Sequence, residues 1–159
     1  MKTSHISPGA HTLTPYITIK GCSKAIDFYK KAFGATERGR LLMPDGKIAH
    51  AELEIEGSLL MMADENIEWG NKGPQTIGGN PMSFALYVKE VDKAFQKAVD
   101  AGATVVMPIE DMFYGDRLGQ VMDPFGYKWM IVTHKEDVSF EEMQKRSDKV
   151  FSKQAQVTT

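Results

Sequence analysis

The sequence lacks the features that mark several common classes of protein. Its 159 residues contain one cysteine, Cys22, which excludes an internal disulfide bond and is typical of a reducing compartment. No segment approaches the roughly 18 consecutive apolar residues of a transmembrane helix, and the polar first residues do not resemble a signal peptide. We therefore expect a soluble, cytoplasmic protein without a membrane partner.

Charge of one sign is not in excess either. The chain has 19 Lys and Arg residues against 21 Asp and Glu, a formal net charge of -2, and no basic stripe, so nucleic acid is not an expected partner. Gly-rich phosphate loops, Cys-x-x-Cys pairs and the His-Glu-x-x-His and Gly-x-Ser-x-Gly motifs are absent, which leaves nucleotide hydrolase, zinc protease and serine hydrolase activities without support. The 42% of hydrophobic residues suffices for the core of one domain over residues 1–159.

What the sequence does contain is an internal repeat with an offset of 69 residues. Residues 14–20 (TPYITIK) align with residues 83–89 (SFALYVK), and Gly57-Ser58-Leu59 aligns with Gly126-Tyr127-Lys128. Self-similarity of this kind fixes the architecture of a chain, because each copy adopts the same arrangement of elements.

Each copy predicts the order βαβββ. In the first copy, Ala25, Ile26, Tyr29 and Phe33 recur at helical spacing after the first strand, and Gly34 ends the helix. The second copy repeats this pattern and ends its helix at Gly102. The strands expected after the helices are residues 36–43, 48–55 and 58–63 in the first copy and 104–109, 117–122 and 128–133 in the second.

These elements divide the single domain into modules. Module one spans about residues 13–65 and module two about residues 82–136, and the Gly- and Pro-rich residues 66–81 between them are expected to form a loop. Ser139 followed by Glu142 is a helix-capping pattern, which predicts a C-terminal helix over about residues 140–151. The fold class is α+β, with two tandem βαβββ modules.

Two tandem βαβββ units with the segments IDFYKKAFGA (residues 26–35) and DPFGYKWMIV (residues 123–132) resemble the vicinal oxygen chelate superfamily, which has the glyoxalase/bleomycin resistance/dioxygenase fold. FYGDR (residues 113–117) and THKEDV (residues 133–138) are similar to the PhnB-type branch. The resemblance covers about residues 13–146. It implies curved mixed sheets that form a cup for a small molecule, with cups completed across the subunits of a homodimer.

The resemblance also allows a test for the superfamily's divalent metal. Its enzymes take metal ligands from the first and last strand of each unit, and these positions fall on Thr14, Met61, Ser83 and Met130. None of these four is a good ligand for a hard divalent ion. We therefore expect no metal at that centre and no cofactor.

Alternation along the first strand indicates which side chains face the cup. If Thr14 faces the cup, so does Tyr16, whereas Leu13, Ile17 and Ile19 fall on the opposite face and are expected in the core.

The strand over residues 48–55 divides in the same way. Its alternation predicts that His50 and Glu52 project together toward the cup. Two ionisable groups on the face of a pocket are candidates for a functional site. The opposite parity is expected in the core: Ala49, Ala51, Leu53 and Ile55.

Residues near the end of the second module complete the candidate site. We expect Arg117 to converge with His50 and Glu52, because a guanidinium binds anionic groups bidentately. The resemblance implies that the loop over residues 111–119 lies beside the cup. Alternation along the last strand, counted from Met130, also places His134 on the cup face. The other expected ligand-binding residues are Tyr16, Phe113, Tyr114 and His134.

Two functions remain open at this stage. One is a metal-independent binding protein of the bleomycin-resistance kind that holds a small, anionic or hydroxylated ligand. The other is an enzyme, a glyoxalase-like lyase or isomerase, with Glu52 as general base and His50 as acid, with or without a divalent metal displaced onto His50, Glu52 and His134.

Overall fold

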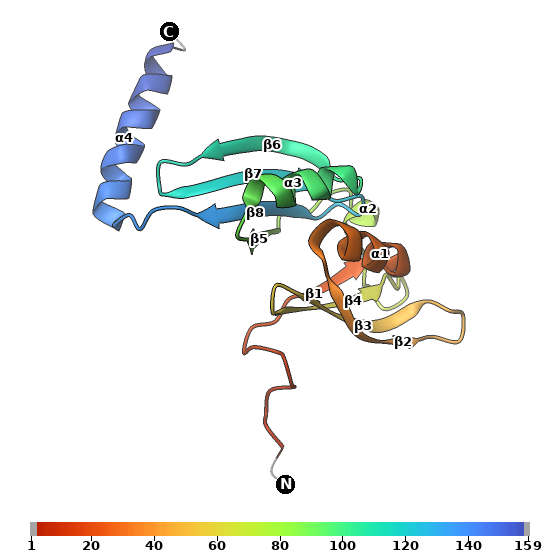
Figure 1. Ribbon diagram of the computed structural model, residues 1–159. Coiled ribbons are helices and arrows are strands. Elements are labelled where there is room, and N and C mark those ends of the chain that lie inside the picture. The colour runs from red at the N-terminus through yellow and green to blue at the C-terminus, as the bar shows by residue number, and fades with distance from the viewer. Residues whose placement is uncertain (1–2, 158–159) are drawn as a thin grey trace.

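The protein consists of two βαβββ modules joined by a linker and followed by a long helix (Figure 1). The computed structural model describes residues 3–157. The elements are β1 (Tyr16–Ile19), α1 (Cys22–Phe33), β2 (Thr36–Leu42), β3 (Ile48–Ile55), β4 (Ser58–Asp64), α2 (Pro74–Ile77), β5 (Ser83–Tyr87), α3 (Val91–Asp100), β6 (Thr104–Asp111), β7 (Asp116–Met122), β8 (Lys128–His134) and α4 (Phe140–Val157).

Each module folds into one four-stranded mixed sheet. The strand orders are β1-β4-β3-β2 and β5-β8-β7-β6, in which β1 and β5 each pair in parallel with the last strand of their own module. Figure 1 shows the two sheets one after the other: β6 and β2 lie at the outer ends, and β5 and β1 lie where the two modules meet. Helices α1 and α3 pack against each other and against their own sheets, so a single core joins the modules.

The strand register confirms the 69-residue repeat. Tyr16 pairs with Met61 in the first sheet, and Ala85 pairs with Met130 in the second. Residues 16 and 85 are 69 positions apart, and so are residues 61 and 130. The two modules are therefore related residue by residue, as the sequence predicts.

The end of the last strand caps the helix in each module. The Asp64 carboxylate accepts hydrogen bonds from the backbone N–H groups of Gly21 (3.0 Å) and Cys22 (2.8 Å), at the start of α1. The Thr133 hydroxyl, 69 residues later, accepts one from the N–H of Val91 (3.0 Å), at the start of α3. Because the first N–H groups of a helix have no partner within it, these two side chains fix where each helix begins on its sheet.

Two residues expected in the core lie outside it. Ile17 and Ile19 are buried as predicted, but Leu13 is 89% exposed because the strand begins only at Tyr16, so the alternation does not extend to it. Ala49 is exposed because a bulge between β2 and β3 reverses the alternation at the start of β3, which buries Ile48 instead.

The segments outside the modules contain more helix than predicted. The linker includes the short helix α2, whose Gln75 side chain donates to the Pro124 carbonyl oxygen (2.8 Å). Ser139 caps α4 as predicted, its hydroxyl accepting from the N–H of Glu142 (3.2 Å), but the helix continues past residue 151 to Val157. In the described part of the chain, no helix has both the length and the apolar composition needed to cross a membrane.

A buried carboxylate joins the two modules. Asp123, in the turn before β8, accepts hydrogen bonds from the Tyr29 hydroxyl of α1 (2.7 Å), the Trp129 indole N–H (3.0 Å) and the backbone N–H groups of Phe125 and Tyr127 (both 2.9 Å). Burial raises the pKa of the Asp123 carboxyl, and the four donors act against that effect by stabilising the charged form. The surrounding aromatic cluster comprises Phe28, Tyr29, Phe33, Phe84, Phe125, Tyr127 and Trp129.

Replacing Tyr29 with Phe is expected to destabilise the protein, because it leaves the buried Asp123 carboxylate with one donor fewer. Loss of a hydrogen bond to a charged group should lower the free energy of unfolding by about 2 kcal/mol and the Tm by about 4–8 °C. Tyr87→Phe, which removes a hydroxyl from a tyrosine that is 58% exposed, is the matched control. Thermal and urea denaturation measure both variants, and equal effects would contradict the importance of the Tyr29–Asp123 bond.

Candidate functional site

His50 and Glu52 lie together on the face of the first sheet opposite α1, as the alternation of β3 predicts. We call the sheet faces opposite the helices the open faces. His50 Nε2 is 3.5 Å from Glu52 Oε1, and His50 Nδ1 is 3.3 Å from the hydroxyl of Tyr16 on β1. With its proton on Nε2, the imidazole donates toward the carboxylate and accepts from the phenol. The side chains of His50 and Glu52 are 32% and 28% exposed, so the pair is accessible to a ligand.

Arg38 is a third charged member of this group and was not expected from the sequence. Its Nη1 lies 3.6 Å from Glu52 Oε2 and donates to the Pro8 carbonyl oxygen (2.9 Å). It also packs against Gly9, where a Cβ atom would collide with the guanidinium. Strand β2 shows little alternation, and a register shift between Glu37 and Gly39 sets the direction of Arg38, so its position could not be inferred from the pattern.

A shallow cavity of about 260 Å³ opens beside these residues. Arg40, on its rim, forms an ion pair with Glu37, and this interaction together with Lys30 lowers the pKa of the Glu37 carboxyl to about 2. The cavity thus offers a carboxylate, an imidazole and the Arg38 guanidinium next to an apolar side chain. The Arg40 guanidinium is already held by Glu37 and Ser23. The residues lining the cavity are Arg38, Gly39, Arg40, Leu41, His50 and Glu52.

Arg117 does not converge with this group, and that prediction is wrong. Its guanidinium binds Asp92 of α3 bidentately (2.7 and 3.0 Å) and Asp111 (3.1 Å). The reason is parity, because Gly119, two residues further along β7, packs against Phe95 of α3. Arg117 therefore projects toward the helix-covered face of the second sheet.

The remaining predicted residues form a separate group on the second module. His134 Nδ1 lies 2.7 Å from Asp116 Oδ1, and His134 Nε2 lies 2.9 Å from Asp137 Oδ1. These two hydrogen bonds raise the pKa of His134, and burial raises that of the Tyr114 phenol. The Phe113 ring packs on Tyr114, at a centroid distance of 5.2 Å. The expected single cluster is thus two clusters, one on each sheet.

The four positions that correspond to metal ligands do not fit a divalent metal. Met61 and Met130 supply soft thioethers, and the Thr14 hydroxyl already donates to the His11 carbonyl oxygen (2.9 Å) and accepts from the His11 N–H (3.0 Å). Within residues 3–157 no group of three or more His, Cys, Asp or Glu side chains has the arrangement of a metal site. No chemistry through a metal can be derived from these residues.

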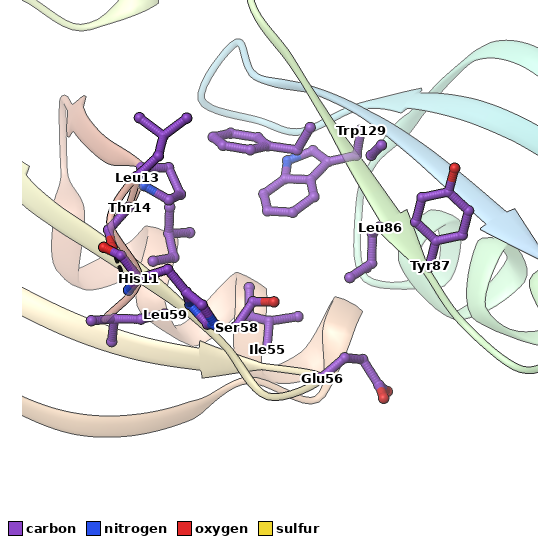
Figure 2. A pocket seen from close by; sticks show the side chains of 14 residues that line it. His11, Leu13, Thr14, Ile55, Glu56, Ser58, Leu59, Leu86, Tyr87 and Trp129 are labelled. Atoms are coloured by element: carbon purple, nitrogen blue, oxygen red, sulfur yellow. Dashed lines mark hydrogen bonds between the residues drawn. The ribbon is translucent and has the colours of Figure 1, made fainter. Parts of the chain in front are cut away.

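A mostly apolar cavity lies elsewhere, between the modules. It has a volume of about 370 Å³, and Figure 2 shows Leu13, Thr14 and Leu59 on the side of the first module facing Leu86, Tyr87 and Trp129 on the other. Sequence patterns gave no signal for this cleft, since it forms where two sheet edges meet.

Comparisons with known proteins agree on the fold. The family model described as Glyoxalase/Bleomycin resistance protein/Dioxygenase superfamily matches residues 5–131. An uncharacterized protein of Mycobacterium bovis is 44% identical over 135 residues, which cover 83% of this chain and 89% of that protein.

Solved structures show the same arrangement. The structure of a gene product of Arabidopsis thaliana has a TM-score of 0.63 and 31% identity, covering 76% of this chain and 97% of that chain. A PhnB protein from Bacillus cereus has a TM-score of 0.60 and covers 77% of this chain and 99% of that chain. Its identity is 18%, so this second likeness concerns the fold alone.

The two carboxylates at His134 predict a measurable shift in its titration. Because its folded pKa is raised above the ordinary value near 6.5, its contribution to stability should be fully present below that pH and be lost as the pH rises through the folded pKa. Asp137→Asn should move the pKa of His134 back toward 6.5. The ring protons of His134 report it in an NMR titration, with Asp45→Asn in the other module as control. An unchanged pKa in Asp137→Asn would contradict the assignment.

Proposed function

The chain belongs to the glyoxalase/bleomycin resistance protein/dioxygenase superfamily, and we propose that it is a small-molecule-binding protein whose ligand lies on the open faces of its sheets. Proteins of this superfamily generally bind small molecules and often form dimers. The observation that supports the proposal is the group of His50, Glu52, Tyr16 and Arg38, which gathers four polar side chains from three strands on one accessible face.

The chemistry of this group favours a hydroxylated or anionic ligand. The Glu52 carboxylate can accept a hydrogen bond from a ligand hydroxyl, and the His50 imidazole can donate to or accept from one. Arg38 can turn from Glu52 toward an anionic oxygen of the ligand. Tyr16 and Leu41 supply apolar walls beside them, 52% and 65% exposed. A few convergent polar groups within apolar walls are typical of small-molecule sites.

We also propose that a homodimer completes the site. Tyr16 and Leu41 lie on the face of the first sheet that carries His50 and Glu52, and both are more than half exposed. Apolar side chains gathered on one face of a protein commonly mark an interaction surface. A second copy placed over this face would enclose the ligand, which a single open sheet does not.

An enzyme activity is the second candidate, and the position of His50 favours it. The imidazole lies between a phenol and a carboxylate, which suits a reaction in which Glu52 as general base takes a proton from the substrate and His50 as acid returns one to it. A glyoxalase-like lyase or isomerase would use such a pair, with or without a metal displaced onto His50 and Glu52. Metal analysis of protein purified without chelator, then isomerase assays before and after dialysis against chelator, distinguishes the two candidates.

Glu52→Gln should weaken ligand binding without unfolding the protein. Loss of one charge-assisted hydrogen bond corresponds to about 10- to 100-fold in Kd. The free energy of unfolding should change by less than about 0.5 kcal/mol, since the carboxylate is partly exposed. Glu54→Gln, two residues along the same strand, is the matched control. Small molecules that copurify with the wild type are identified by mass spectrometry and titrated into each variant, and a drop in stability without a change in Kd would sink the proposal.

Sedimentation equilibrium tests the dimer. At micromolar concentration the expected mass is twice the 17.7 kDa of one chain. Leu41→Arg, which adds a charge at the exposed apolar rim, should shift the equilibrium toward monomer, whereas a charge at the equally exposed Ile77 of α2 should not. A wild-type protein that stays monomeric throughout would refute this arrangement.

A further inference from the structure

The cleft between the modules is distinct from the open-face group and has a different chemistry. One wall is the segment over residues 11–15 that leads into β1, together with the turn between β3 and β4. The other wall is made of four consecutive residues of β5, Phe84, Ala85, Leu86 and Tyr87, with Trp129 of β8 behind them. Because side chains alternate along a strand, four consecutive lining residues mean that the edge of β5 itself faces the cleft.

The pairing of β5 with β8 shows which backbone groups that edge presents. The Val88 N–H donates to the Val132 carbonyl oxygen (2.8 Å), so the backbone groups of Val88 point toward β8, and with a period of two so do those of Leu86. The N–H and C=O groups of Ala85 and Tyr87 therefore point away from β8, into the cleft. Because β5 is an edge strand that pairs with β8, these four groups have no partner strand, and no loop or turn backbone hydrogen bond within residues 3–157 reaches them.

Apolar surface lies directly beside this free edge. The rings of Trp129 and Phe84 are tilted by 33° with their centroids 4.6 Å apart, and Leu86 and Leu59 lie on either side of the space in front of them. A purely apolar ligand would cover the Ala85 and Tyr87 backbone groups without pairing them, which is costly. The cleft thus favours a ligand that has both apolar side chains and its own row of amide donors and acceptors.

We propose that this cleft binds a short peptide, or a peptide-like amide, in extended conformation as an added strand on the edge of β5. The N–H and C=O groups of an extended peptide recur every second residue, at about 6.6–6.8 Å, which matches the spacing from Ala85 to Tyr87. An apolar side chain of the peptide packs toward Leu86 and Trp129. Addition of a strand to a free sheet edge is an established mode of peptide recognition, in which the backbone supplies affinity and side-chain pockets supply specificity.

A capped dipeptide tests the proposal directly. N-acetyl-leucyl-phenylalanine methylamide is titrated into the ¹⁵N-labelled protein up to millimolar concentration, while the backbone amide signals are followed by NMR. The amide signals of Ala85 and Tyr87 are expected to shift in a saturable way. The same peptide with methylated backbone nitrogens keeps its side chains but has lost its donors, so its binding should be at least tenfold weaker. Equal binding of the two peptides, or no shift at Ala85 and Tyr87, would overturn the proposal.

Ala85→Pro removes the proposed donor from the protein side. Proline is tolerated on an edge strand where the missing N–H faces away from the partner strand, so pairing with β8 should persist. The variant should keep its Tm and lose at least tenfold in affinity for the dipeptide; a folded variant with unchanged affinity contradicts the proposal. The methylated peptide provides the same test if the variant does not fold. Glu52→Gln should bind the dipeptide like the wild type, which separates this site from the open-face site.

Discussion

The buried carboxylate of Asp123 is the interaction on which the relative placement of the two modules depends. A charge that is 3% exposed is costly unless donors surround it, and the donors come from a turn, from β8 and from α1 of the other module. The Tyr29 hydroxyl can reach Asp123 only when α1 lies against the start of β8. A second hydrogen bond between the modules, from the Tyr127 hydroxyl to the Thr18 carbonyl oxygen (2.9 Å), holds β1 of the first module near the start of β8 in the second. Together they fix the distance between β1 and β5, and hence the width of the cleft.

The distribution of polar groups follows from this placement. Because both helices pack into the same core, the two polar clusters lie on the faces of the sheets opposite the helices, whereas Arg117 pairs with Asp92 and Asp111 on the helix side. The first sheet gathers a carboxylate, an imidazole and a guanidinium there, and the second gathers a histidine between two carboxylates. The two open faces therefore carry different chemistry although their backbones are related by repeat.

Most of the fold could be predicted from the sequence, because the repeat and the alternation of apolar residues are local signals. The order of elements, the two sheets and the pairing of His50 with Glu52 all follow from periods of 3.6 and 2. What failed were positions where the period is broken: a bulge exposes Ala49, and the late start of β1 exposes Leu13. Arg117 was misplaced for another reason. Its polar character suggested the cup, whereas its position in the strand, and two aspartates that no periodicity reveals, hold it on the helix side. Arg38 and the cleft depend on contacts between segments far apart in the chain.

The Tyr29–Asp123 hydrogen bond between the modules occurs only in one direction, although the modules themselves are repeated. The repeat would allow the Tyr29–Asp123 bond to occur twice, but the residue 69 positions after Tyr29 is Ala98, and the residue 69 positions before Asp123 is Glu54. Two copies of the second half would thus lack the tyrosine, and two copies of the first half would carry the longer side chain of Glu54, exposed on β3, in place of the buried Asp123. If the chain arose by duplication, the acquisition of this one-sided bond made the two halves mutually dependent. From that point each half could diverge in its surface chemistry, while neither could be exchanged for the other.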